Sequence, residues 1–304
     1  MKRVVVLFAA LALLPAGGAQ AAHAPNDPYY SKQWGLKRID AAAAWHRSEG
    51  KDVIVAVLDT GVSPHEDLPT RMTGWDAINN RSGANDVDIH GTHVAGIIAA
   101  ARNNGRGIAG VAPKAKILPV RVCGPDNCNA VWSGLIWAAD HGAQVINMSL
   151  GPETMAGAVL GAADPFEVYA AARGAVVVAS AGNEGEPVCG HPGLTTICVG
   201  ALDKVGGLAG FSNYGAAIDV VAPGVDIVST IPSGYGGLSG TSMAAPFVSG
   251  VAALLIGMGA TNVQAASIIT ATAEDRGLPG YDHTYGWGVV DAKAAVDLCA
   301  QICP

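Results

Sequence analysis

The sequence predicts an α/β fold in which a mostly parallel central sheet carries helices on both faces. Three observations predict it: short runs rich in Val and Ile, longer Ala-rich stretches with helical spacing, and their alternation along the chain. Short, nearly continuous apolar runs are typical of strands buried on both faces. Alternating strands and helices imply parallel strands joined by crossover helices, which pack on the two faces of the sheet.

The elements can be placed in order along the chain. The expected strands are residues 53–58, 116–122, 144–148 and 175–179. The expected helices are residues 94–101, 131–141, 156–173 and an apolar helix that follows residue 242. In parallel sheets of this kind the active site collects at the carboxyl ends of the strands. Candidate chemistry is therefore sought directly after each strand.

The first 21 residues have the pattern of a secretory signal peptide. Lys2 and Arg3 precede an apolar run from Val4 to Leu14, and Ala19-Gln20-Ala21 matches a cleavage site. The run is shorter than the ~20 apolar residues that a membrane-spanning helix needs. We therefore expect export and a single domain over residues 22–304, with no recognisable propeptide between the two.

Composition argues for a compact protein and against a nucleic-acid partner. Half of the residues are hydrophobic, 14% are charged, and the net charge is -7. The leader holds two of the basic residues and none of the acidic ones, so the chain beyond it is more acidic still. Acidic proteins repel phosphate backbones. We expect a secreted monomer, extracellular or periplasmic, that does not bind a membrane after signal cleavage.

Six cysteines in an exported chain favour disulfide bonds. They fall into three local couples, Cys123 with Cys128, Cys189 with Cys198 and Cys299 with Cys303. Fifteen pairings are possible, and we favour the local one because each couple brackets turn-forming residues. The alternative is free thiols or metal ligands, although the spacings do not resemble a zinc site.

Three polar residues lie where strands end or helices begin. Asp59 follows the strand 53–58 directly, His90 opens the segment His90-Gly91-Thr92-His93, and Ser242 leads into the last apolar helix. Each has an ordinary alternative. Asp59 could cap a turn and Ser242 a helix, and the two histidines could hold a metal, although no H-E-x-x-H pattern supports that.

Together the three residues predict nucleophilic catalysis by serine. A serine hydroxyl needs a base to take its proton, and the base needs a carboxylate that holds its tautomer. A helix N-terminus beside Ser242 favours developing negative charge. The chain order Asp, His, Ser is one of the known orders of this triad.

These segments resemble the signature blocks of the subtilisin-like serine peptidases, in particular the thermitase-type branch. The resemblance runs from about Asp27 to Ala295 and implies a calcium-binding endopeptidase with a three-layer α/β fold that hydrolyses proteins through an acyl-enzyme, with broad specificity. A dedicated processing peptidase and an inactive, protease-like peptide-binding protein are the alternatives. The chain departs from the family in lacking a recognisable propeptide and in its short, cysteine-flanked segment 186–198.

The resemblance also implies the remaining site residues. Asn183 would donate its side-chain amide to the oxyanion, with the backbone N–H of Ser242 as the second donor. The backbone of Ser149, Leu150 and Gly151 would pair with the substrate as an added strand. Together with Ser180, Ala181 and Gly182, this segment would wall the primary specificity pocket.

A structural Ca²⁺ site is the last feature that the resemblance implies. Its side-chain ligands would be Asp27, Asp67 and Asn104. Carbonyls of Ala101, Arg106 and Ile108 would complete an all-oxygen shell, as Ca²⁺ prefers. The alternative is that Asp27 is a solvated turn residue and that the loop closes without metal.

Overall fold

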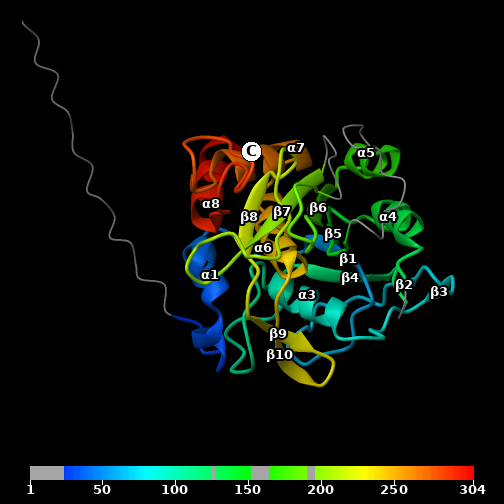
Figure 1. The fold of residues 1–304 in the computed structure, drawn as a ribbon. Helices are drawn as coiled ribbons and strands as arrows, with labels where there is room; N and C mark the ends of the chain where they lie inside the picture. Colours follow the sequence, from blue (N-terminus) through cyan, green and yellow to red (C-terminus); the bar gives the residue numbers. More distant parts are fainter. Residues whose placement is uncertain (1–23, 125–126, 152–163, 190–195) are drawn as a thin grey trace, which may run out of the picture.

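The computed structural model describes residues 24–124, 127–151, 164–189 and 196–304 (Figure 1). The predicted signal peptide, residues 1–21, lies outside the described residues. So does the first part of the helix predicted for residues 156–173.

A central eight-stranded sheet organises the fold, as predicted. Its strand order is β3-β2-β4-β1-β5-β6-β7-β8, and every neighbouring pair is parallel except β2 and β3. The strands of this sheet are β1 (Ile54–Asp59), β2 (Trp75–Asp76), β3 (Arg81–Ser82), β4 (Lys116–Arg121), β5 (Val145–Met148), β6 (Val176–Ser180), β7 (Thr196–Leu202) and β8 (Val220–Pro223). A separate antiparallel hairpin consists of β9 (Ile227–Ile231) and β10 (Gly234–Leu238).

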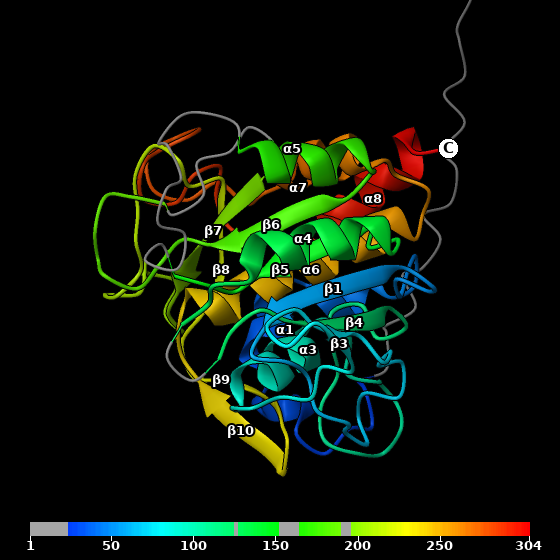
Figure 2. The ribbon, with the colours of Figure 1, turned by 90° about the vertical axis from the view of Figure 1, so that its right-hand side faces the viewer.

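Both faces of the sheet are buried, which explains the continuous apolar runs. In β1, Val55 and Val57 face one core, and Ala56 and Leu58 face the other. The first core is covered by α3 (His90–Ala99), α6 (Thr241–Ile256), α7 (Asn262–Ala271) and α8 (Ala292–Ile302), with η1 (Tyr30–Lys32), α1 (Trp34–Arg38) and α2 (Ala41–Ala44) beside them. The second is covered by α4 (Val131–Asp140) and α5 (Pro165–Ala172). Figure 2 shows α4 and α5 in front of the sheet and α6 behind it.

The long helix α6 connects the core to the site. All of its residues from Met243 to Leu255 are buried, and it contacts β5, β6, β7 and β8 as well as α3. Complete burial of an apolar helix stabilises a fold by roughly 1.5–3 kcal/mol for each large side chain. The N-terminus of α6, where Ser242 lies, is thereby fixed against the carboxyl ends of the strands.

The cysteines form the three local disulfide bonds that the sequence favours: Cys123–Cys128, Cys189–Cys198 and Cys299–Cys303. No described cysteine is free. The second bond ties the loop after Asn183 to β7, and the third closes the last turn of α8.

Across the described ranges, no helix has both the length and the apolar character needed to cross a membrane.

Candidate active site

Asp59 and His90, two of the candidate catalytic residues, meet at the carboxyl end of β1. Asp59 is the last residue of the strand and is fully buried, and His90 is the first residue of α3. The Nδ1 atom of His90 lies 2.8 and 3.0 Å from the two oxygens of Asp59. Gly91 permits this approach, because a Cβ atom there would lie 2.0 Å from the carbonyl oxygen of Gly61. Any larger residue at position 91 would push the helix off the strand.

A second carboxylate, that of Asp86, joins the end of β1 to the first turn of α3. Asp86 accepts hydrogen bonds from the hydroxyl of Thr60 and from the backbone and hydroxyl of Thr92, in the first turn of α3. The hydroxyl of Thr60 also lies 3.2 Å from Asp59 Oδ1, and the backbone N–H of Thr60 donates to that atom. Asp59 therefore keeps its orientation through bonds that do not depend on His90.

The acidic surroundings tune the imidazole. Burial disfavours the charged form of His90, but the negative charges of Asp59, Asp86 and Asp88 and the hydrogen bond that His90 donates to Asp59 outweigh it, so the pKa of His90 is raised above its ordinary value. A histidine with a raised pKa is a stronger base once it is neutral.

Ser242 lies in the first turn of α6, half-buried, two residues after the N-cap Gly240. Its hydroxyl donates to the carbonyl oxygen of Ser149 at 3.3 Å. No hydrogen bond joins it to His90 in the part of the chain that the structure describes. Catalytic hydrogen bonds are commonly long in substrate-free enzymes and tighten when substrate binds.

Asn183 is oriented for donation by its neighbour Thr241. The Oδ1 atom of Asn183 accepts from the backbone N–H of Thr241 at 2.8 Å and from its hydroxyl at 3.0 Å. Because a backbone N–H can only donate, this contact identifies the oxygen of the amide. The exposed Nδ2 group remains for a ligand.

The two predicted substrate-binding segments lie side by side. Ser149 to Gly151 follow β5, and Ser180 ends β6, which pairs with β5. The hydroxyl of Ser180 donates to the carbonyl of Leu150 at 2.9 Å, and the N–H of Gly182 donates to the Thr241 hydroxyl at 3.1 Å. These bonds tie both segments to the start of α6. Ala181 is fully buried, and its carbonyl accepts from Asn213.

The residues predicted to bind calcium also converge, where the N-terminal segment meets the loop after α3. Asp27 accepts from the backbone N–H groups of Asn103 and Asn104, and the side-chain amide of Asn104 donates to Asp67 at 2.6 Å. Two further contacts come from predicted ligand residues: the N–H of Ala101 donates to the carbonyl of Asp67, and the N–H of Ile108 to its carboxylate. The backbone N–H of Arg106 donates to Asn104 Oδ1.

His93 does not join His90 in a metal site. It is fully buried, and its Nε2 atom lies 2.9 and 3.2 Å from the carbonyls of Ile227 and Gly236 in the β9–β10 hairpin. Burial lowers the pKa of His93 to about 4. Among the described residues, no group of three or more acidic, histidine or cysteine side chains could hold a metal.

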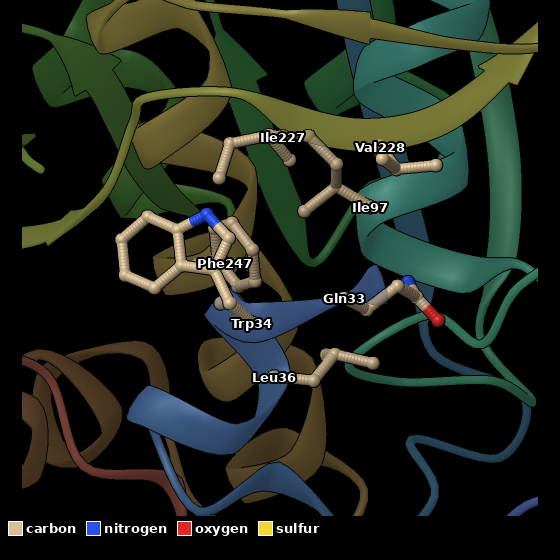
Figure 3. Close-up of a pocket in the computed structure, with 8 residues that line it drawn as sticks. Gln33, Trp34, Leu36, Ile97, Ile227, Val228 and Phe247 are labelled. Carbon is tan, nitrogen blue, oxygen red and sulfur yellow. The ribbon is translucent and has the colours of Figure 1, made fainter. Parts of the chain in front are cut away.

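A small cavity of about 10 Å³ lies between α1, α3, β9 and α6 (Figure 3). Its lining is mostly apolar, and the amide of Gln33 is already bonded to the backbone of Ala109. A buried water needs two to four polar partners. The cavity is a packing void, and none of the predicted site residues lines it.

The sequence analysis missed the hydroxyl, carboxylate and amide groups that position the site. They belong to Thr60, Asp86, Asn147, Thr241 and Asn213. Thr60 and Thr241 adjoin Asp59 and Ser242 in sequence, which is the one signal that could have found them. Asn147 and Asn213 reach the site only through the fold, whereas Asp86 lies just before α3 and bonds to Thr92, six residues later.

The comparisons with known proteins agree with this geometry. The sequence profile described as "Subtilase family" matches residues 50–288. Thermitase of Thermoactinomyces vulgaris is 45% identical over 285 residues, which cover 90% of this chain and 99% of thermitase. Subtilisin Savinase of Lederbergia lenta is 42% identical over 274 residues, covering 87% and 98% of the two chains.

Solved structures give the same answer. The chain is similar to a protease of Pseudoalteromonas arctica PAMC 21717, with a TM-score of 0.81, 35% identity, and coverage of 91% of this chain and 99% of that one. It is also similar to fervidolysin of Fervidobacterium pennivorans, described as a keratinolytic enzyme related to subtilisin, with a TM-score of 0.77 and 33% identity. That match covers 92% of this chain and 48% of fervidolysin. The chain therefore belongs to the subtilase family, as a thermitase-like, subtilisin-type serine endopeptidase.

Proposed function

We propose that the peptide bond is cleaved by a triad of Ser242, His90 and Asp59. The observation that carries the proposal is the pair of contacts, 2.8 and 3.0 Å, between His90 Nδ1 and the buried carboxylate of Asp59. This pairing fixes the proton of the neutral imidazole on Nδ1 and leaves Nε2 as the base. Ser242 supplies the nucleophile from the first turn of α6.

The reaction proceeds in two halves. His90 takes the hydroxyl proton as Ser242 Oγ attacks the carbonyl carbon, and the imidazolium then gives that proton to the leaving amine as the peptide bond breaks. Water, deprotonated by the same imidazole, hydrolyses the acyl-enzyme, and the proton returns to Oγ. Asp59 stabilises the imidazolium in both halves without taking its proton.

The oxyanion is held by the Nδ2 group of Asn183 and the backbone N–H of Ser242. Thr241 fixes the Asn183 amide, so little reorganisation is needed when charge develops. An extended peptide would pair with the backbone of residues 149–151, and residues 149–151 and 180–182 would together wall the pocket for the side chain before the scissile bond. Backbone pairing of this kind binds many sequences, so we propose broad specificity, with a dedicated processing role as the second candidate. Digestion of a peptide library separates the two: many products support breadth, and cleavage at a single motif supports processing.

Asn183→Leu tests the oxyanion assignment. Its bond to the reacting oxygen forms fully only in the transition state, so the substitution should lower kcat by about 10² to 10³, the range measured for this asparagine in subtilisin, with little change in KM. Steady-state kinetics on one peptide substrate would check it. A rise in KM with unchanged kcat would show that Asn183 only lines the groove.

We further propose that a structural Ca²⁺ binds at Asp27, Asp67 and Asn104. The donor set fits a hard cation: Asp27 and Asp67 are almost fully buried carboxylates, and no described Lys or Arg pairs with either. Arg106 pairs with Glu66 instead. Burial raises the pKa of Asp67, because the hydrogen bonds from Ile108, Asn104 and Tyr235 only partly offset the cost of a buried negative charge. A bound cation would remove that cost and tie the N-terminal segment to the loop after α3.

Calcium should therefore raise the melting temperature. A ligand that binds only the folded state adds about 2.7 kcal/mol to the free energy of unfolding when its free concentration is a hundred times Kd. Calorimetry of phosphonate-inhibited protein in EDTA and in millimolar calcium would measure the difference. Asp27→Asn should abolish the calcium-dependent increase, whereas Asp76→Asn, which removes a buried acid paired with Arg121, should leave it intact. Equal melting temperatures in both buffers for the wild type would refute the site.

We also propose that residues 1–21 direct secretion and are removed on export. Expression with and without these residues, followed by mass spectrometry of the released chain, would test it. A mature N-terminus near residue 22 outside the cell is expected, and retention of the full chain in the cell would contradict it.

A further inference from the structure

The carbonyl group of Ser242 lacks its usual helical partner. In an α-helix the carbonyl of residue i accepts from the N–H of residue i+4. For Ser242 that residue is Pro246, which lies inside α6 and has no N–H. An unpaired carbonyl at a buried helix start is costly, so a replacement donor is expected.

Ser149 supplies the replacement donor. Its hydroxyl lies 2.8 Å from the Ser242 carbonyl oxygen, and the Ser149 side chain is 2% exposed. The contact is reciprocal, because the Ser242 hydroxyl donates to the Ser149 carbonyl. Residue 149 thus holds both the backbone and the side chain of residue 242.

Two further side chains fix the direction of the Ser149 hydroxyl. The amide of Asn147, on β5, donates to Ser149 Oγ at 2.9 Å, so the hydroxyl proton must point away from it, toward Ser242. The hydroxyl of Ser249, on α6, donates to Asn147 Oδ1 at 2.8 Å and thereby sets the amide. Asn147 and Ser249 are fully buried.

We propose that Ser149, oriented by Asn147 and Ser249, is a positioning residue for the nucleophile. Asn147 lies on β5, a central strand between β1 and β6. Its hydrogen bond to Ser149 therefore anchors the first turn of α6 to a rigid part of the sheet. It fixes the Ser242 backbone, which carries both the nucleophilic oxygen and one oxyanion N–H. This inference rests on the proposed role of Ser242, and it assigns to the Ser149 side chain a task separate from substrate pairing by its backbone.

The direct test is Ser149→Ala. Displacing a reacting group by about 1 Å can cost roughly 10²-fold in rate, so we expect kcat to fall by about 10- to 100-fold while KM changes by less than about threefold. The rate of inactivation by a serine-directed phosphonate should fall in parallel. Asn147→Asp should have a similar effect, because a carboxylate cannot donate to Ser149 and would draw its proton away.

Ser48→Ala is the matched control. The Ser48 hydroxyl also donates to a carbonyl of α6, that of Leu254, at the same 2.8 Å, but at the other end of the helix. This variant should lose a comparable amount of thermal stability and keep the wild-type kcat. A fall in kcat as large as that of Ser149→Ala would show a general effect of loosening α6 and would overturn the proposal.

A second variant tests the reason for the contact. Pro246→Ala restores the N–H that Ser242 lacks, so the double variant Ser149→Ala/Pro246→Ala should have a kcat several-fold above that of Ser149→Ala. If the fold-losses in kcat of the two single variants simply multiply in the double variant, the assignment is overturned. Wild-type kcat in Ser149→Ala, with Ser242→Ala inactive, would refute this inference alone. An active Ser242→Ala enzyme would refute the proposed nucleophile as well.

Discussion

Ser242→Ala is expected to lower kcat by roughly 2 × 10⁶, the loss measured for the same substitution in subtilisin itself. The reason is chemical: without Oγ no acyl-enzyme can form, and the neighbouring Ser149 hydroxyl is committed to the carbonyl of residue 242. The small residual rate would come from the oxyanion donors and from substrate binding. The fold should remain, since a half-buried hydroxyl that makes one 3.3 Å bond is removed.

The measurement is kcat on a chromogenic peptide, with a melting curve of each protein as the control for folding. Binding of a peptide product should persist in the variant, because the groove is unchanged. Activity within tenfold of the wild type would rule out Ser242 as the nucleophile.

Asp59→Asn is expected to lower kcat by about 10⁴ near neutral pH. An asparagine amide can donate to Nδ1 and stabilise the tautomer that carries its proton on Nε2, which cannot act as the base. The variant also loses the negative charge that stabilises the imidazolium. The Thr60 and Asp86 bonds at this corner should preserve the geometry, so KM should change little.

The pH dependence gives an independent readout of the same variant. The wild-type enzyme needs neutral His90, so kcat/KM should fall as pH drops through the raised pKa of His90. Removing the Asp59 charge lowers that pKa, and the residual activity of Asp59→Asn should therefore persist to lower pH than that of the wild type. If kcat/KM of Asp59→Asn falls at the same acidic pH as that of the wild type, Asp59 does not set the pKa of the base. Asp297→Asn, which removes an acid on α8 that pairs with Arg47 and Lys293, is the control that should not move it.

The core of the fold and the positions of the three candidate catalytic residues could be predicted because their signals are local. The buried strands β1, β4, β5 and β6 are continuous Val/Ile runs, and each was placed within one residue of its observed bounds. Asp59, His90 and Ser242 lie at element ends that the sequence marks directly. The strands β2, β3, β7 and β10 were not predicted. β2 and β3 have two residues each, β10 contains three glycines, and β7 is interrupted by Cys198 and Gly200, so none shows a clear period.

The supporting contacts could not be predicted because they join residues distant in sequence. Asn147 and Ser249 are 102 residues apart, and Ser149 and Ser242 are 93 apart. Nothing in the sequence around Asn147 distinguishes a strand that orients Ser149 from an ordinary buried strand. Only the crossover topology, which places β5 against the start of α6, brings these groups together.

The central claim is that the acyl group is carried by Ser242, and active-site labelling tests it most directly. The protein would be treated with one equivalent of a serine-directed phosphonate, digested after reduction, and analysed by mass spectrometry. We predict one label per chain, on the peptide that contains Ser242, complete loss of activity in proportion to labelling, and no label on Ser242→Ala. Labelling of another serine, or loss of activity without modification of Ser242, would contradict the account.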